Sequence, residues 1–197
     1  LMTAQLANGG FKINPKLIVN KDDLTFEDIK SKMSKNLEKK IEGPDFDNAL
    51  VDLGMSSSKD DNLYSPLFRN QENVKFVLEA MFASTNEVRG TSYSSRIEDK
   101  KYQFAGKTGT SQVKRITEAQ RELDLDISQI PYEDRDHALY IAFGPYKNPR
   151  YAMSIFIEHG GSGGSTAAPM AKKLFKVVID RHEEREKFKQ KNINFVA

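Results

Sequence analysis

Two nearly continuous apolar runs in the second half of the chain constrain its fold most strongly. Residues 138–143 (Ala-Leu-Tyr-Ile-Ala-Phe) and 151–157 (Tyr-Ala-Met-Ser-Ile-Phe-Ile) are separated by 144–150, Gly-Pro-Tyr-Lys-Asn-Pro-Arg. Apolar runs bounded by such residues are typical of strands, and so short a connection favours an antiparallel hairpin. Because strands without a polar face need cover on both sides, we expect helices in front of and behind the sheet.

Two helices are predicted by apolar residues at helical spacing. The first covers 70–84, with a stripe formed by Val74, Val77, Leu78, Met81 and Phe82. The second follows the glycine-rich loop 160–164, and its stripe is Ala171, Leu174, Phe175, Val178 and Ile179. Ser165 or Thr166 is expected to cap it, with Pro169 tolerated in its first turn. The sequence therefore predicts an α+β fold, in which an antiparallel sheet of about three to five strands is flanked by helices.

The first 70 residues carry weaker signals. Residues 1–7 have the pattern of a helix end closed by Asn8, Gly9 and Gly10, which suggests that the helix begins before this chain does and that the chain is a fragment. Residues 11–19 predict an edge strand or an extended segment at best, and Thr25 is a candidate cap for a helix that ends near Leu37. We interpret 20–70 and 114–136 largely as loops or insertions.

Charge and composition exclude several classes of function. The 30 basic and 28 acidic residues give a net charge of +2, so nucleic acid is not expected as a partner. The chain has no cysteine, which excludes disulfides, thiolate metal sites and a cysteine nucleophile. His137, His159 and His182 are scattered without metal-like spacing, so no metal is expected. No apolar segment approaches the roughly 20 residues that span a bilayer.

The segment 103–113, Gln-Phe-Ala-Gly-Lys-Thr-Gly-Thr-Ser-Gln-Val, has strand character but unusual chemistry for a core strand. Lys107 supplies a compact cation with three donors, and Thr108 and Thr110 supply hydroxyls that donate and accept. Gly106 and Gly109 remove side-chain bulk, so a ligand can approach the backbone. A short peptide that ends in a carboxylate would satisfy these groups, with its backbone paired to the strand.

Alternation along the strand places Lys107 and Thr108 on opposite faces. Both reach one ligand only if that ligand lies along the strand edge, so we expect an exposed edge beside a cleft. Read alone, the four residues 107–110 are also compatible with an ordinary strand or turn.

The order of motifs along the chain adds a resemblance to a known family. The motifs are 90–92 (Gly-Thr-Ser), 107–113 (Lys-Thr-Gly-Thr-Ser-Gln-Val), 142–146 (Ala-Phe-Gly-Pro-Tyr) and 158–163 (Glu-His-Gly-Gly-Ser-Gly). This order resembles the C-terminal part of the transpeptidase domain of class B penicillin-binding proteins, nearest to their elongation type. The resemblance covers most of the chain. It implies a partial transpeptidase fold of the penicillin-binding-protein and serine β-lactamase kind over 1–182, followed by a charged, solvated tail at 183–197.

The resemblance also implies a function. Members of the family are serine acyltransferases that cross-link peptidoglycan stem peptides, are acylated by β-lactams, and need no cofactor. By resemblance, Lys107 would be catalytic, positioning the substrate carboxylate and supporting proton transfer. Thr108 and Thr110 would bind that carboxylate, the Thr110 N–H would form half of the oxyanion hole, Gly109 would allow close approach, and Gln112 would line the same groove. The resemblance further implies a membrane glycosyltransferase partner and a location on the periplasmic face of the bacterial inner membrane.

The family also uses a Ser-x-x-Lys nucleophile motif and a Ser-x-Asn motif, and neither is expected in a working position here. Ser56 to Lys59 lies in a polar tract, and Ser111 to Lys114 spans opposite faces of a strand. The string 84–86, Ser-Thr-Asn, ends a helix. We therefore expect that the chain lacks its nucleophile and is not acylated by penicillin on its own. Two alternatives stay open: a non-catalytic module that recognises a peptide or a β-lactam, and a plain structural α/β domain.

Overall fold

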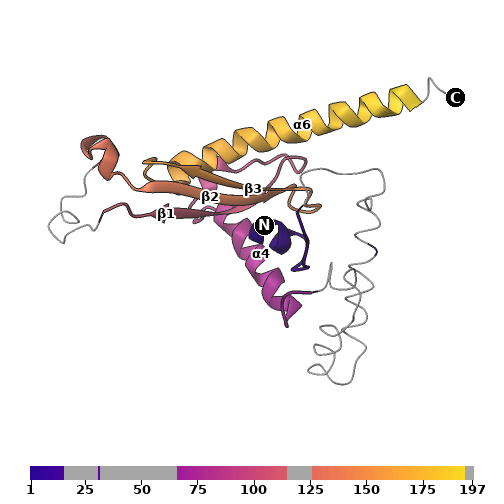
Figure 1. Ribbon diagram of the computed structural model, residues 1–197, viewed down its shortest axis with the longest axis horizontal. Coiled ribbons are helices and arrows are strands. Elements are labelled where there is room, and N and C mark those ends of the chain that lie inside the picture. Colours follow the sequence, from indigo (N-terminus) through magenta and orange to yellow (C-terminus); the bar gives the residue numbers. More distant parts are fainter. Residues whose placement is uncertain (16–30, 32–65, 115–125, 194–197) are drawn as a thin grey trace. The chain divides into compact units, whose positions relative to one another are not determined.

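The computed structural model describes residues 1–15, 31, 66–114 and 126–193, with side chains up to Phe188 (Figure 1). The predicted helix at 25–37, apart from residue 31, and the Ser56 to Lys59 string lie outside the described residues. The chain divides into two compact units, Leu1–Val77 and Leu78–Ala197. The helix α4, Gln71–Asn86, runs through the boundary and matches the helix expected at 70–84.

The first unit begins with the short helix α1, Met2–Ala7. Gly9 and Gly10 follow with φ angles of +91° and +88°, the left-handed region that glycine adopts without strain, and the Gly10 amide donates to the Gln5 carbonyl. The expected helix stop at 8–10 is therefore confirmed. Of the segment 11–19, residues 11–15 are described, and Phe11 forms an isolated antiparallel bridge with Pro66.

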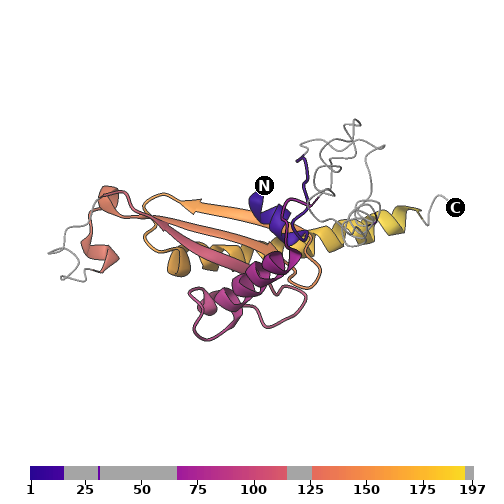
Figure 2. The ribbon, with the colours of Figure 1, turned by 90° about the horizontal axis from the view of Figure 1, so that it is seen from below.

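The second unit is built on a three-stranded antiparallel sheet in the order β1-β2-β3. The strands are β1 (Ala105–Ser111), β2 (His137–Gly144) and β3 (Tyr151–Ile157), and Figure 2 shows them side by side. The β2–β3 register, from Ala138 opposite Ile157 to Gly144 opposite Tyr151, confirms the predicted hairpin.

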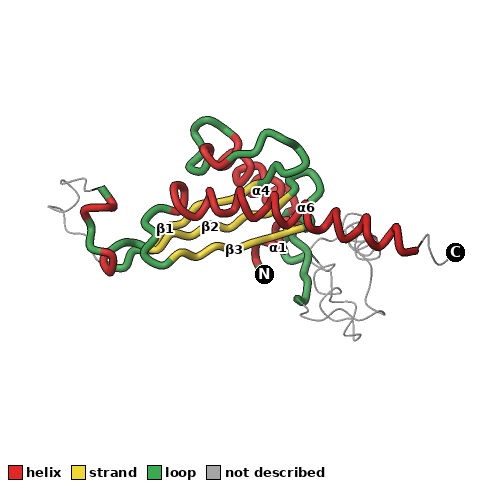
Figure 3. Tube along the Cα trace, turned by 90° about the horizontal axis from the view of Figure 1, so that it is seen from above, coloured by secondary structure: helices red, strands yellow, loops and turns green. Residues whose placement is uncertain are grey.

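The helix α6, Ala168–Ile193, crosses one face of the sheet (Figure 3). Its Ala171, Phe175 and Ile179 are buried against Tyr140 of β2 and its neighbours. This packing sits at i, i+4 and i+8, so Leu174, which was placed in the stripe, lies on the flank and is 46% exposed. The stripe prediction was wrong at that residue.

The start of α6 also differs from the prediction. A single π-helical turn, Gly163–Ala167, precedes it, so neither Ser165 nor Thr166 is its N-cap. The Thr166 hydroxyl donates 2.8 Å back to the Gly160 carbonyl, which closes the glycine loop. Pro169 is the second residue of α6, as expected.

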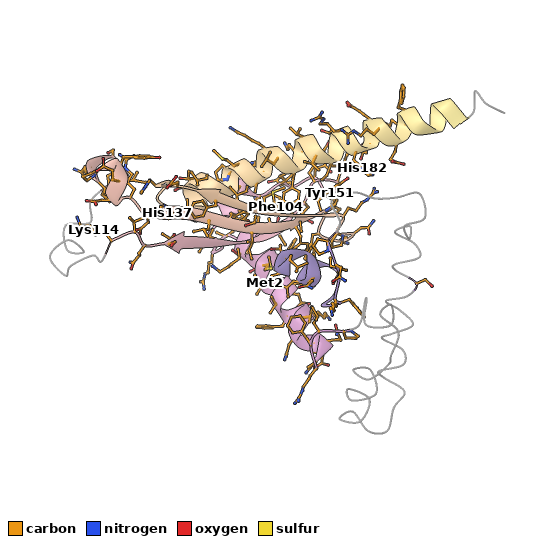
Figure 4. All side chains as sticks on the ribbon, in the orientation of Figure 1. Met2, Phe104, Lys114, His137, Tyr151 and His182 are labelled. Carbon is orange, nitrogen blue, oxygen red and sulfur yellow. The ribbon has the colours of Figure 1, made fainter. Side chains whose placement is uncertain are left out.

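The C-terminal part of α6 and the strand β3 differ from what the sequence predicted. The charged segment expected as a solvated tail continues α6 as far as Ile193. Figure 4 shows Tyr151 close to His182 of α6. The centroids of the two rings are 5.8 Å apart. In β3, Tyr151, Met153, Ile155 and Ile157 alternate toward the core. Ala152, Ser154 and Phe156 are exposed in the described part of the chain, where cover on both faces was expected.

Candidate active site

Strand β1 carries the Lys-Thr-Gly-Thr sequence and forms one edge of the described sheet. It pairs only with β2 there, from Ala105 opposite Phe143 to Ser111 opposite His137. Its other edge has no strand partner among residues 66–114 and 126–193. A strand edge without a strand partner is the kind of surface to which an extended peptide can add, and the peptide-binding role expected for β1 remains a prediction.

Alternation along β1 separates its functional side chains as predicted. Thr108 lies opposite Tyr140, which faces the core beneath α6, whereas Lys107 lies opposite Ile141. Lys107 is exposed, and its Nζ donates a 2.8 Å hydrogen bond to the Thr108 carbonyl of its own strand. Thr110 and Gln112 are also exposed. A ligand along the free edge could thus meet the ammonium from one face and the hydroxyls from the other.

Three buried hydroxyl groups, those of Thr85, Ser92 and Tyr140, form hydrogen bonds beside β1. The Tyr140 hydroxyl lies 2.8 Å from Thr85 Oγ1 and 3.1 Å from Ser92 Oγ. Burial raises the pKa of the Tyr140 phenol, and the bonds to Ser92 and Thr85 only partly offset this, so the phenol stays neutral near neutral pH. A side chain at Gly106 would collide with the Tyr140 hydroxyl, so this glycine allows the ring to pass beneath the strand.

Side chains at the end of α4 also make hydrogen bonds to the residue just before β1 and to Thr91, which in turn bonds to Thr108 of β1. The Asn86 amide donates to the Phe104 carbonyl (2.9 Å), immediately before β1, and to the Phe82 carbonyl (3.1 Å). Ser84 Oγ lies 3.2 Å from Thr91 Oγ1, which lies 2.9 Å from Thr108 Oγ1. The Ser84-Thr85-Asn86 string is thus engaged in holding β1, and the absence of a catalytic role for it remains a prediction.

In the Ser111 to Lys114 string, the lysine is engaged in an ion pair with another residue. Lys114 Nζ makes a 3.0 Å ion pair with Asp134, away from Ser111 in the edge strand. Lys114 is thus paired with an acidic partner, and the expectation that this string is not a nucleophile motif remains a prediction.

The glycine loop 160–164 lies directly against the candidate site. A side chain at Gly163 would collide with the backbone oxygens of Gly109 and Leu139, and one at Gly164 with the Thr91 carbonyl. The loop therefore packs on the backbone of β1 and β2 and on the 90–92 turn. The loop is thereby held beside the strand that carries residues 107–110.

The histidines were described as scattered, and for two of them this was wrong. The His159 amide donates 3.0 Å to His137 Nδ1, and the His159 Nδ1 lies 3.0 Å from the Arg135 carbonyl. His137 lies opposite Ser111 at the end of the sheet where β1 ends (Figure 4), and the ring of His159 lies 4.8 Å from that of His137. Their bonds are to each other and to backbone, and no group of metal-ligating side chains occurs among the described residues.

Comparison with known proteins defines the class. The penicillin binding protein transpeptidase domain matches residues 2–176, and the chain belongs to this family. Peptidoglycan D,D-transpeptidase MrdA of Salmonella typhimurium (strain SL1344) is 40% identical over 104 residues, 53% of this chain and 16% of that protein. MrdA of Haemophilus influenzae is 32% identical over 101 residues, 51% of this chain and 15% of that protein. The chain thus spans about a sixth of these curated relatives.

A solved structure agrees with both the family and the fold. Pseudomonas aeruginosa PBP2, in complex with WCK 5153, is 25% identical, with a TM-score of 0.54 over 89% of this chain and 28% of that one. The PBP2-type class B resemblance and the partial transpeptidase fold are therefore confirmed. No described helix has the length and apolar character needed to cross a membrane.

The sequence did not reveal the residues that support β1. It assigned no supporting role to Thr85, Thr91, Ser92 or Tyr140. One signal was available: Thr85 follows Met81 by four residues, so it continues the buried stripe of α4 with a polar side chain. A polar residue in a buried stripe indicates a hydrogen-bond partner elsewhere in the fold.

Proposed function

We propose that this chain forms the Lys-Thr-Gly side of the active site of a peptidoglycan D,D-transpeptidase. The observation that carries the proposal is the position of residues 107–110 on a free sheet edge, with an exposed ammonium on one face and a hydroxyl on each side of Gly109. This arrangement suits an extended peptide that ends in a carboxylate, because backbone pairing and charge recognition act together.

Each residue has a proposed part in acyl transfer. Lys107 provides positive charge for the substrate carboxylate and supports proton transfer. Thr108 and Thr110 bind the same carboxylate through their hydroxyls, and the Thr110 N–H stabilises the developing oxyanion. Gly109 and Gln112 shape the groove. A β-lactam would use the same groups, because it presents a carboxylate beside a reactive carbonyl.

The nucleophile is proposed to come from sequence that this chain does not provide. Without the nucleophilic serine, the covalent route of acyl transfer is lost, and oxyanion stabilisation alone leaves a small residual rate. We therefore propose that the complete protein reacts with peptidoglycan stem peptides and β-lactams, works with a membrane glycosyltransferase, and acts on the periplasmic face of the inner membrane. The 197-residue chain alone is proposed to be inactive.

Labelling with a fluorescent penicillin tests the proposal. The protein expressed from the complete reading frame that contains this chain should label covalently, and the 197-residue chain should not. Mass spectrometry of the labelled protein should place the adduct on a serine outside residues 1–197. An adduct on Ser56 or Ser111 would contradict the missing nucleophile. Reversible binding of penicillin with no adduct in either protein would instead support a non-catalytic recognition module.

A further inference from the structure

Thr91 lies at the meeting point of three elements beside the candidate site. Its Oγ1 is 3.2 Å from Ser84 Oγ in the last turns of α4 and 2.9 Å from Thr108 Oγ1 in β1. Its backbone carbonyl lies against Gly164 of the glycine loop, where a side chain would have no room. One residue therefore contacts the helix, the loop and a hydroxyl proposed to bind substrate.

The turn that carries Thr91 is held firmly. The Ser92 amide and the Ser92 hydroxyl both donate to the Ser84 carbonyl, each at 3.0 Å. A side chain at Gly90 would collide with that same carbonyl, so the turn lies flat on the end of α4. The position of the Thr91 hydroxyl is thus set by the fold, although the side chain itself is exposed.

Thr108 has few ways to orient its hydroxyl. A β-branched side chain has a stiff χ1 angle, and the Thr108 methyl Cγ2 is directed toward Gly164, 3.7 Å from where a Cβ there would lie. With the methyl on that side, the Thr108 hydroxyl is directed to Thr91 Oγ1. The remaining variable is the direction of its proton.

We propose that Thr91 is a positioning residue that directs the Thr108 proton toward a bound carboxylate. Each hydroxyl has one proton, so a Thr108 that donates to a carboxylate accepts its other hydrogen bond from Thr91. Thr91 then accepts from Ser84, and the three hydroxyls form a chain polarised toward the ligand. This inference rests on the proposed function of the same site.

The test measures acylation of the complete protein by a penicillin and by the methyl ester of the same penicillin. Thr91→Val keeps the side-chain shape and removes the hydroxyl. It should lower the second-order acylation rate constant for the free acid by roughly three- to tenfold. The rate for the ester should stay unchanged, because the ester has no charged carboxylate to receive the directed proton.

Matched variants separate positioning from folding. Thr91→Ser should keep the rate of the unchanged protein, and Ser94→Ala, at an exposed serine of the same segment, should have no effect. Adding Thr91→Val to Thr108→Val should cause no further loss, since the two residues act through one hydrogen bond. An equal fall for acid and ester would show a structural role and overturn the inference, as would an unchanged rate. If the unchanged protein is not acylated, the proposed function fails and this inference fails with it.

Discussion

The hydroxyl of Tyr140 occupies the space beside Gly106 that any larger residue at that position would need. A Cβ on Gly106 would lie 2.7 Å from Cε1 of the Tyr140 ring and closer still to its hydroxyl, well inside van der Waals contact. The same hydroxyl binds Thr85 and Ser92. The strand proposed to bind substrate therefore rests on a core tyrosine that is tied to the end of α4.

Replacement of Gly106 by alanine tests this close contact. Gly106→Ala should lower the free energy of unfolding by about 3 kcal/mol, because the new methyl group overpacks against a buried ring. Gly109→Ala in the same strand is the matched control. Among the described residues its Cβ would meet only the Leu139 Cβ, at 3.3 Å, so the expected cost is about 1 kcal/mol or less. Urea unfolding of the 197-residue chain compares the two, and equal costs would contradict the packing described here.

Removal of the Tyr140 hydroxyl tests the buried hydrogen bonds. Tyr140→Phe should lower the free energy of unfolding by about 1 kcal/mol, since Thr85 and Ser92 lose a buried partner. The loss stays moderate because Ser92 Oγ still donates to the Ser84 carbonyl. Tyr132→Phe, at a tyrosine that is 59% exposed, removes the same atom and should change stability little. A Tyr140→Phe variant as stable as the Tyr132→Phe variant would show that the buried hydroxyls do not depend on this contact.

The contact between α6 and the approach to β1 should depend on pH. Lys101 Nζ lies 3.0 Å from Asp180 and 2.9 Å from Glu183, and the Tyr102 hydroxyl donates to Asp180 at 2.6 Å. The hydrogen bonds from Tyr102 and Lys101 lower the pKa of Asp180. Hydrogen bonds within the same cluster, that with Tyr102 foremost, raise the pKa of Lys101.

The direction of the pH effect follows from these shifts. A lowered carboxyl pKa means that stability is present above the ordinary pKa of an aspartic acid and is lost as the pH falls through the native value. A raised ammonium pKa means that stability is present below the ordinary pKa of a lysine and is lost as the pH rises through the native value. The cluster should therefore stabilise the fold across the neutral range.

A charge-removing variant measures this effect. Asp180→Asn should lower the melting temperature at neutral pH, and the difference from the unchanged chain should disappear in strong acid, where Asp180 is protonated. Glu184→Gln, at an exposed carboxylate of the same helix, is the control and should give a small difference at every pH. Thermal unfolding from about pH 2 to about pH 8 gives both curves. A difference for Asp180→Asn that persists unchanged into acid would contradict the assignment.

The parts of the fold that follow local rules were predictable from sequence. The hairpin of β2 and β3 and the helices α4 and α6 are predicted by the spacing of apolar residues within each segment, which needs no knowledge of distant residues. Leu174 shows the limit of this reading. Helical spacing places it next to Phe175 in a stripe, but which side of the stripe meets the sheet depends on how the helix is seated, a tertiary property.

The supporting contacts of the site were harder to predict because their partners are distant in sequence. Tyr140 and Thr85 are 55 positions apart, and Tyr140 reads as one more large residue of a core strand. His137 and His159, 22 positions apart, were within reach of prediction. A hairpin centred on 144–150 pairs Ala138 with Ile157, which brings His137, the first residue of β2, close to His159, two residues past the end of β3.

The most direct test of the account is the role of Lys107 in the complete protein. Lys107→Ala should reduce the second-order rate constant for acylation by a carboxylate-bearing β-lactam by about 10- to 100-fold, the loss expected for a charge-assisted hydrogen bond. Lys101→Ala is the control. It removes a lysine that precedes β1 and pairs with Asp180 and Glu183 of α6, and it should leave this rate constant unchanged. If Lys107→Ala and Lys101→Ala react as fast as the unchanged protein, Lys107 of β1 does not bind the carboxylate in the active site.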